Sequence, residues 1–203
     1  MIDSLIFDWG GVLIDDPAPG LMTYCARTLG VGVDEYVTAH KRHGEPFQKG
    51  EISEAVFWQR VCGDLDRPEP AGTSLWGEAF RAEYSERPEV FDLARRLQAK
   101  RYKTGLLSNT ETAAMAFFRE LGYDMFDGLV FSCAEGTFKP EQWIYEIAAQ
   151  KLGTEPERCA VIDDRQIFVD GAVEAGMKGI LYRDLEQVCR ALGEYGVVLP
   201  ETR

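Results

Sequence analysis

Asp8 follows the apolar run Leu5–Phe7 and comes shortly before the pair Gly10-Gly11. This pattern predicts a buried strand that ends at Asp8 and then turns sharply, because glycine adopts backbone conformations that other residues avoid. A carboxylate held at the end of a strand can attack phosphorus or a polarised carbon and form a covalent intermediate. Position 10, two residues after Asp8, is glycine and not a second acid.

Three further apolar runs are also followed by polar residues: Thr104–Leu107 by Ser108-Asn109, Gly128–Phe131 by a loop that ends at Lys139, and Cys159–Ile162 by Asp163-Asp164. Open parallel sheets bind their ligands beyond the carboxyl ends of the strands, so we expect these groups to meet Asp8 in one crevice. One polar residue at a strand end is commonly only a turn or a helix cap. All four groups in this order favour a shared site.

The four groups together suit attack on an anionic phosphoryl group. Asp8, Asp163 and Asp164 would form an oxygen-rich pocket of the kind that binds Mg²⁺, which offsets the repulsion between nucleophile and phosphate. Lys139 would neutralise Asp8 and one phosphate oxygen, and Ser108 with nearby backbone N–H groups would donate to another. The predicted catalytic residues are Asp8 and Lys139, and the predicted phosphate-binding residues are Ser108, Asn109 and Lys139.

The elements that must position these groups alternate in the second half of the chain. Amphipathic stretches lie near 88–100, 111–121, 140–151, 167–175 and 184–193, and the last apolar run is Gly179–Tyr182. Strands that alternate with helices are typical of an α/β protein with a parallel sheet covered on both faces, here with five strands. Residues 15–87 contain no clear strand, and Ser53 is the expected N-cap of a helix within them. We expect 1–14 and 88–203 to form the core domain and 15–87 a helical cap domain.

The chain resembles the haloacid dehalogenase (HAD) superfamily of hydrolases in the order and spacing of its four motifs: Phe7-Asp8-Trp9-Gly10-Gly11-Val12-Leu13, Leu107-Ser108-Asn109, Lys139-Pro140-Glu141 and Ile162-Asp163-Asp164. The resemblance covers the whole chain. It implies a Rossmann-like core with a helical cap inserted after the first motif, and an aspartyl intermediate on Asp8. It also implies Mg²⁺ held by Asp8, the backbone carbonyl of Gly10 and Asp164, with Asp163 nearby.

The chain departs from most phosphatases of this superfamily at Gly10, where they have a second Asp that protonates the leaving alcohol. Such assistance is worth roughly 10²–10⁴-fold. Either the leaving group needs little protonation, or another residue such as Asp15, Asp16 or His43 delivers the proton, or the protein catalyses poorly, if at all. Members with Gly-Gly or Gly-Asn here resemble sugar-phosphate phosphatases, notably those acting on glucose 1-phosphate, which favours the first explanation.

Two other functions stay open beside a Mg²⁺-dependent phosphatase. A 2-haloacid dehalogenase also lacks the second Asp, but dehalogenases of this fold work without metal and have Ser and Asn in place of the paired acids. Asp163 and Asp164 would crowd negative charge around a carboxylate substrate, so they favour the phosphatase. The other alternative is a non-catalytic phosphate-binding or regulatory module that lost turnover together with the acid.

The predicted cap offers candidate substrate contacts. Arg42 and His43, within Lys41–Phe47, are candidates to contact a sugar hydroxyl or a second phosphate, but this pattern favours a charged helix C-terminus that stops at Gly44. Four more expectations concern packing: Trp9 walls the pocket or packs in the core, Phe57-Trp58 and Trp76 lie in the core of the cap, and Arg165 forms a surface salt bridge rather than a phosphate contact.

Composition limits the partners of this 203-residue chain. Its 22 basic and 34 acidic residues give a formal net charge of −12, which argues against nucleic acid or an anionic membrane as a partner. No apolar run approaches the roughly 18 residues needed to span a bilayer, and no signal peptide is expected before the first strand. Five cysteines without a C-x-x-C pattern predict reduced thiols in a cytoplasmic protein. We expect a monomer or homodimer whose partner is a small phosphorylated metabolite.

Overall fold

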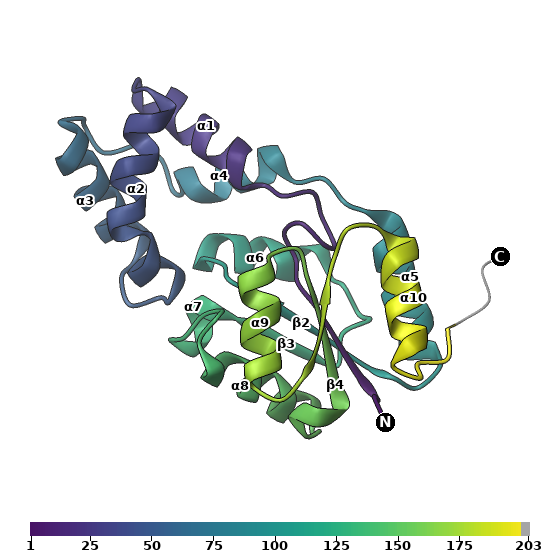
Figure 1. The fold of residues 1–203 in the computed structure, drawn as a ribbon. Helices are drawn as coiled ribbons and strands as arrows, with labels where there is room; N and C mark the ends of the chain where they lie inside the picture. The colour runs from purple at the N-terminus through teal and green to yellow at the C-terminus, as the bar shows by residue number, and fades with distance from the viewer. Residues whose placement is uncertain (200–203) are drawn as a thin grey trace.

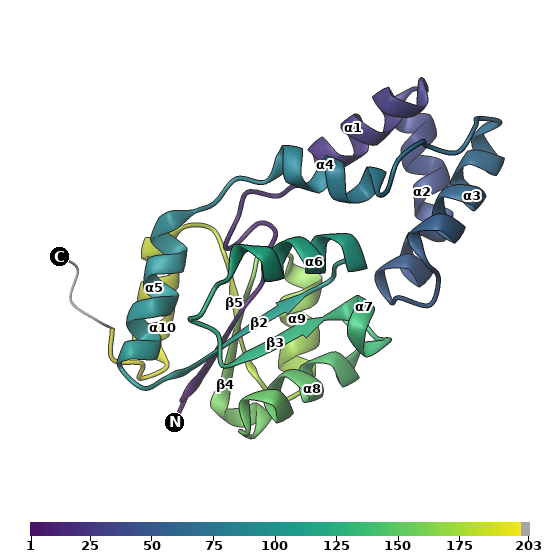
Figure 2. The same ribbon diagram turned by 180° about the vertical axis from the view of Figure 1, so that it is seen from behind.

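The structure is a computed structural model that describes residues 1–199. Its centre is a five-stranded sheet in the order β3-β2-β1-β4-β5, and every neighbouring pair is parallel (Figures 1 and 2). The strands are β1 (Ser4–Phe7), β2 (Lys103–Ser108), β3 (Gly128–Phe131), β4 (Cys159–Asp163) and β5 (Lys178–Leu181). The predicted α/β fold with a parallel sheet is confirmed.

Helices cover both faces of this sheet. One layer contains α5 (Pro88–Ala99), α6 (Thr112–Leu121) and α10 (Leu185–Glu194), and the other contains α8 (Gln142–Leu152) and α9 (Gln166–Glu174). Successive residues of a strand point to opposite faces, so Leu5 and Phe7 pack in the first layer while Ile6 packs in the second. A short helix, α7 (Ser132–Glu135), follows β3, and a 3₁₀ turn at Pro156–Arg158 precedes β4.

Four helices lie between β1 and α5: α1 (Ala18–Leu29), α2 (Val33–Gln48), α3 (Glu54–Leu65) and α4 (Leu75–Glu83). Figures 1 and 2 show them grouped beyond the end of the sheet at which β1 leads into the inserted segment. Ser53 caps α3 as expected, since its side chain accepts a hydrogen bond from the Val56 amide. Phe57 and Trp58 are buried among these helices, as predicted. That 15–87 forms a separate cap domain stays a prediction.

No helix among residues 1–199 combines the length and the apolar character that crossing a membrane requires.

Candidate active site

Strand register brings the predicted carboxylates together. Within the sheet Phe7 pairs with Leu106 of β2 on one side and with Ile162 of β4 on the other. The Asp8 amide then donates to the Ile162 carbonyl over 2.9 Å, so Asp8 and Asp163 lie next to each other at the carboxyl ends of the neighbouring strands β1 and β4. The two carboxylates are far apart in sequence and adjacent in space because β1 and β4 are hydrogen-bonded in parallel.

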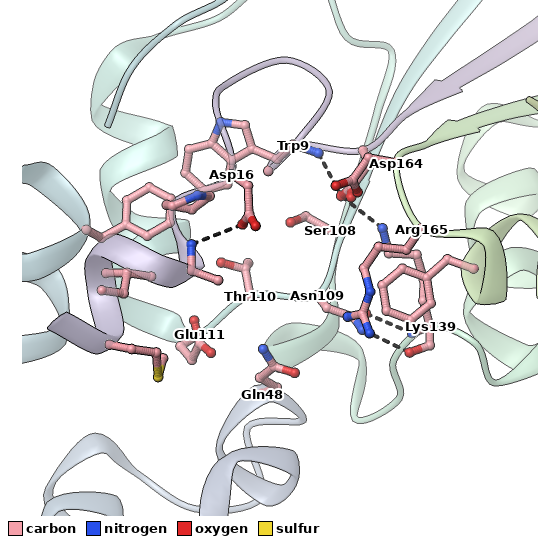
Figure 3. Close-up of a pocket in the computed structure, with 18 of the residues that line it drawn as sticks. Trp9, Asp16, Gln48, Ser108, Asn109, Thr110, Glu111, Lys139, Asp164 and Arg165 are labelled. Atoms are coloured by element: carbon pink, nitrogen blue, oxygen red, sulfur yellow. Dashed lines mark hydrogen bonds and ion pairs between the residues drawn. The ribbon is translucent and has the colours of Figure 1, made fainter. Parts of the chain in front are cut away.

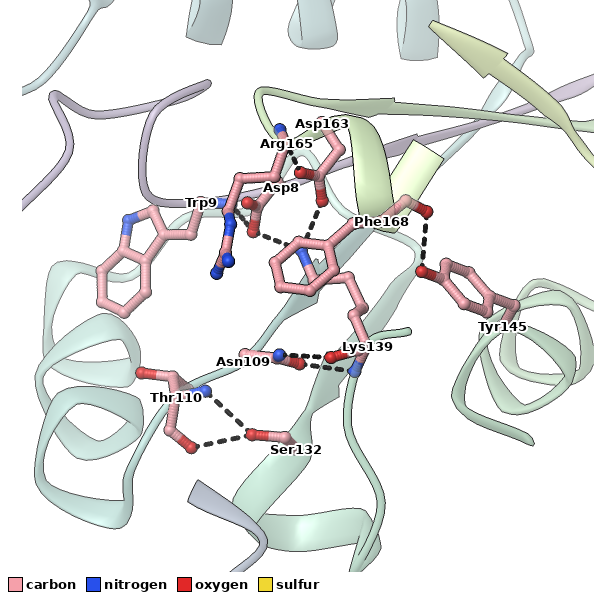
Figure 4. A network of polar contacts seen from close by, with 10 residues as sticks. All are labelled: Asp8, Trp9, Asn109, Thr110, Ser132, Lys139, Tyr145, Asp163, Arg165 and Phe168. Atoms are coloured by element: carbon pink, nitrogen blue, oxygen red, sulfur yellow. Dashed lines mark hydrogen bonds and ion pairs between the residues drawn. The ribbon is translucent and has the colours of Figure 1, made fainter. Parts of the chain in front are cut away.

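Lys139 lies between these two acids (Figure 4). Its Nζ is 2.9 Å from Asp8 Oδ1 and 2.6 Å from Asp163 Oδ2, and its side chain is 1% exposed. Burial lowers the pKa of Lys139, but the charges of Asp8 and Asp163 outweigh this effect and hold that pKa above its usual value. A buried ammonium group persists only when paired in this way, so Lys139 is a fixed positive charge at the floor of the site.

Asn109 holds Lys139 in place. Its side-chain Oδ1 accepts a hydrogen bond from the Lys139 amide over 2.7 Å, and its Nδ2 donates to the Lys139 carbonyl over 2.9 Å. Both ends of the Asn109 amide are therefore used on the main chain of Lys139 (Figure 4). Asn109 also lines the pocket, so its binding of phosphate stays a prediction, while its side chain is engaged with Lys139.

Asp8, Asp163 and Asp164 form the predicted acidic cluster, with one carboxylate oxygen from each within 4.8 Å of the others. Asp163 is already engaged, because its Oδ2 meets Lys139 and its Oδ1 accepts from the Arg165 amide. Burial raises the pKa of Asp8 to about 7 against the opposing effect of Lys139. Burial and the charge of Asp163 also raise the pKa of Asp164. This excess of carboxylates over cations fits a hard divalent cation such as Mg²⁺.

The loop after β1 approaches this cluster closely. Gly11 has φ +84°, and a Cβ at this position would lie 2.2 Å from Oδ2 of Asp164, so only glycine fits here. At Gly10 a Cβ would lie 3.1 Å from Cδ of Pro17. The ring of Pro17, at the start of α1, thus leaves little room for the acid that most phosphatases of the resembled family carry at this position.

A pocket of about 380 Å³ opens between the sheet and the inserted helices (Figure 3). The sheet side contributes Asp8, Ser108, Lys139 and Asp164. Asp16, at the start of the inserted segment, also lines it, whereas Asp15 forms an ion pair with Arg87. Predicted site residues from all four motifs thus meet around one cavity, whereas Asp163 is fully buried behind it.

The structure does not bring Arg42 and His43 to this pocket. Both side chains pair with Asp64 of α3, at 3.2 and 3.0 Å. His40, one turn earlier on α2, lines the pocket instead. The expected substrate contacts of Arg42 and His43 are therefore not supported, because their side chains are used in the packing of α2 against α3.

Two other expectations have mixed outcomes. Trp9 fills both of its expected roles: it lines the pocket and is 1% exposed, packed at 4.8 Å against Phe80. The expected surface salt bridge of Arg165 is absent among residues 1–199. Its guanidinium lies 4.4 Å over the ring of Phe168 and lines the pocket.

Sequence reasoning missed Glu111. This side chain is 3% exposed, lines the pocket and accepts a 2.8 Å hydrogen bond from the indole of Trp76. Burial raises its pKa to about 7. The sequence feature that points to Glu111 as a pocket residue is its position in the loop that follows β2, three residues after Ser108. A carboxylate there also fits an ordinary helix start, since Glu111 is the residue before α6.

The parallel α/β fold, together with the cluster of Asp8, Asp163, Asp164 and Lys139 (the acid–lysine cluster), has the features of a hydrolase of the HAD type. The family model for haloacid dehalogenase-like hydrolases matches residues 2–176, so the chain belongs to this family. This confirms the resemblance found in the four motifs. It also makes the protein a member of a hydrolase family.

Three curated relatives differ in how much of their length the chain covers. The match to acyl-CoA dehydrogenase family member 10 of Mus musculus is 27% identical over 79% of this chain but only 16% of that protein. The sesquiterpene phosphatase of Aspergillus oryzae is 24% identical over 93% of this chain and 94% of its own. The phosphorylated carbohydrates phosphatase of Thermotoga maritima is 26% identical, with 88% and 84% covered.

Solved structures share the fold. A predicted HAD-like hydrolase of Porphyromonas gingivalis has a TM-score of 0.77 at 22% identity and covers 96% of this chain and 98% of its own. A HAD family enzyme of Bacteroides thetaiotaomicron, in complex with magnesium and inorganic phosphate, has a TM-score of 0.75 at 21% identity, with 93% and 99% covered. L-2-haloacid dehalogenase of Xanthobacter autotrophicus has a TM-score of 0.64 at 21% identity, with 98% and 85% covered.

Proposed function

We propose that this protein is a Mg²⁺-dependent phosphatase that hydrolyses a small phosphorylated metabolite through an aspartyl-phosphate on Asp8. One observation carries the proposal: a buried Lys139 is paired with Asp8 at the floor of a pocket in which Asp164 adds a further carboxylate. Lys139 opposes the rise that burial causes in the pKa of Asp8 and so favours its ionised form, and it places a positive charge beside the carboxylate nucleophile that attacks phosphorus.

The reaction divides into two displacements. Asp8 attacks phosphorus in line, a P–O bond forms to its carboxylate, and the bond to the leaving oxygen breaks. Water then attacks the same phosphorus, which releases inorganic phosphate and restores Asp8. Lys139 and the Ser108 hydroxyl bind phosphate oxygens throughout. Mg²⁺, for which Asp8, Asp164 and the Gly10 carbonyl are the proposed ligands, supplies positive charge beside the phosphate.

Asp16 is the proposed donor of the proton that the leaving oxygen needs. It lines the pocket, and its charge contributes to the raised pKa of Asp164. The other two candidates are engaged elsewhere, Asp15 with Arg87 and His43 with Asp64. A substrate with a good leaving group, such as an anomeric phosphate, would depend less on Asp16.

Two relatives support the substrate class, a sesquiterpene phosphatase and a phosphorylated carbohydrates phosphatase. The match to this chain spans most of the length of each. A sugar phosphate is the proposed form of the metabolite. We extend the proposal to a cytoplasmic location, because all five cysteines are free, as is usual in a reducing compartment. A monomer or homodimer is the proposed assembly. The net charge of −12 favours a small-molecule partner over nucleic acid or an anionic membrane.

The decisive experiment is a screen of purified protein against phosphate esters and 2-chloropropionate, each with and without Mg²⁺. Metal-dependent release of inorganic phosphate supports the proposal. Halide release without metal supports the dehalogenase, and binding of phosphate esters without turnover supports the regulatory module.

The Asp8→Asn variant provides the mechanistic control. Asn keeps the shape of the side chain but is no nucleophile, so phosphate release should fall by roughly 10⁴-fold or more while the melting temperature shows an intact fold. A folded variant that retains a substantial share of the activity would exclude an aspartyl-phosphate on Asp8.

A further inference from the structure

Glu111 is a buried carboxylate of the pocket that the proposed phosphoryl chemistry does not use. Its Oε2 accepts the hydrogen bond from Trp76, whereas its Oε1 is buried and accepts no well-formed hydrogen bond within residues 1–199; the Gln48 side chain is the donor that lies near it. A buried oxygen without a donor costs free energy, and native proteins seldom leave one in that state. An oxygen of this kind beside a cavity is suited to a donor that arrives with a ligand.

The carboxylate of Glu111 is firmly held in place. Trp76, which donates to it, is itself anchored by Glu54 of α3, whose Oε1 accepts from the Trp76 amide over 2.9 Å. The imidazole of His40 stacks on the same indole, with ring centroids 5.4 Å apart and planes inclined by 14°. A group that is already ordered loses little conformational freedom when it binds a ligand.

Gln48 is the second polar group at this end of the pocket. Figure 3 shows Gln48 beside Glu111 and both set apart from Asp164. The Ser132 hydroxyl donates to the Gln48 carbonyl over 2.6 Å and so fixes the end of α2 next to the loop that contains Glu111. Burial raises the pKa of Glu111, and the Gln48 side chain, which donates an N–H toward this carboxyl, lowers it by a smaller amount.

This pairing of acceptor and donor favours a hydroxyl group. A hydroxyl can donate to Glu111 and accept from Gln48 at the same time, whereas an ammonium group can only donate and a carboxylate or phosphate can only accept. His40, whose pKa burial lowers to about 4, is neutral near pH 7 and adds no charge for an anion. Trp76, Phe80 and Leu21 provide apolar surface around these polar groups.

We propose that Glu111, together with Gln48, binds a hydroxyl group on the organic part of the substrate and so selects phosphate monoesters of polyols or sugars over alkyl phosphates. The inference rests on the proposed phosphatase function, because binding of the phosphate at Lys139 orients the rest of the substrate toward Glu111. Glu111 is a specificity residue in this proposal and takes no part in the displacement at phosphorus.

The test compares matched substrates in a Glu111→Gln variant. The amide oxygen of Gln can still accept from Trp76, but its NH₂ group replaces the Glu111 acceptor. Erythritol 4-phosphate is paired with butyl phosphate, and sorbitol 6-phosphate with hexyl phosphate, at about pH 8, where Glu111 is ionised. The matched control is Glu120→Gln, the same change at an exposed residue of α6 whose partner is Arg81.

We expect kcat/KM for the polyol phosphates to fall roughly 10- to 100-fold in Glu111→Gln and to change by no more than about twofold for the alkyl phosphates. Glu120→Gln should affect neither series. Gln48→Met, a second variant of similar volume, should lower only the polyol series. Equal losses in both series, or no loss in folded Glu111→Gln protein, would overturn the proposal.

A binding measurement separates this inference from the proposed function. Titration calorimetry with the phosphonate analogues of the same compounds reports affinity without turnover. If wild type hydrolyses neither series, the phosphatase proposal fails. The role of Glu111 is then decided by affinity alone: tighter binding of the polyol analogues by wild type, lost in Glu111→Gln, would support it. If the affinities show no such preference, the inference fails as well.

Discussion

The indole N–H of Trp76 donates a 2.8 Å hydrogen bond to Oε2 of Glu111. It joins α4, one of the four inserted helices, to the loop that leaves β2. Since Trp76 is 2% exposed and Glu111 is 3% exposed, this bond lies in the interior. The carboxylate that accepts it also feels the nearby charge of Glu54, which raises its pKa in addition to the larger effect of burial.

This environment makes stability depend on pH. The pKa of Glu111 is raised from 4.5 to about 7 in the folded protein, because burial favours the protonated carboxyl. The contribution of this group to the free energy of unfolding is therefore fully present below pH 4.5 and is lost as pH rises through about 7. The free energy of unfolding of wild type relative to Glu111→Gln should therefore fall by up to about 3 kcal/mol over that interval. Urea unfolding of both proteins from acidic to mildly alkaline pH measures it. A pH-independent difference would contradict a raised pKa.

Restoring an acid at position 10 tests why the chain has glycine there. A Cβ at Gly10 would lie 3.1 Å from Pro17 Cδ, so Gly10→Asp alone should gain little. Combined with Pro17→Ala, which makes room, the same change should raise kcat on alkyl phosphates by roughly 10²-fold. Steady-state rates of the two single variants and the double variant provide the comparison. An equal gain with and without Pro17→Ala would show that Pro17 does not restrict the position.

Asp16 is expected to matter most for poor leaving groups. Asp16→Asn should lower kcat on alkyl phosphates by roughly 10²-fold or more and have a much smaller effect on p-nitrophenyl phosphate, whose leaving group needs little protonation. Asp15→Asn is the matched control, since Asp15 pairs with Arg87 and does not line the pocket. Losses of similar size on both substrates would exclude proton donation by Asp16.

Binding of Mg²⁺ should be measurable without any substrate. A ligand that binds only the folded state stabilises it, by about 2.7 kcal/mol at a concentration 100 times its Kd. Wild type should therefore melt at a higher temperature with Mg²⁺ than with EDTA, and Asp164→Asn should lose most of that shift. Asp170→Asn, at an exposed position on α9, is the control. The same shift in Asp164→Asn as in wild type would remove Asp164 from the metal site.

Sequence alone determined the sheet and the acid–lysine cluster, because both follow from local pattern combined with a general rule. Apolar runs of strand length mark the strands, and polar residues at their ends must meet at one edge when the strands are parallel. Asp8, Lys139 and Asp163 could therefore be assigned to one site although they lie far apart along the chain. The helical nature of 15–87 was equally readable, as the cap of α3 at Ser53 illustrates.

Only the tertiary structure decided which neighbouring residues of the same type line the pocket. His40 and His43 lie one turn apart on α2, as Asp15 and Asp16 lie side by side before α1, and no local pattern separates the members of either pair. The packing of α2 against α3 turns His43 toward Asp64, and Arg87 holds Asp15 away from the pocket.

The roles of Asn109 and Glu111 likewise depend on long-range contacts. Asn109 is fixed by the main chain of Lys139, 30 residues later, and Glu111 by Trp76, 35 residues earlier. A sequence pattern reports the hydrophobicity and spacing of residues close in the chain. The partner of a buried polar group is set by how distant segments pack, and this is the information that only the folded protein contains.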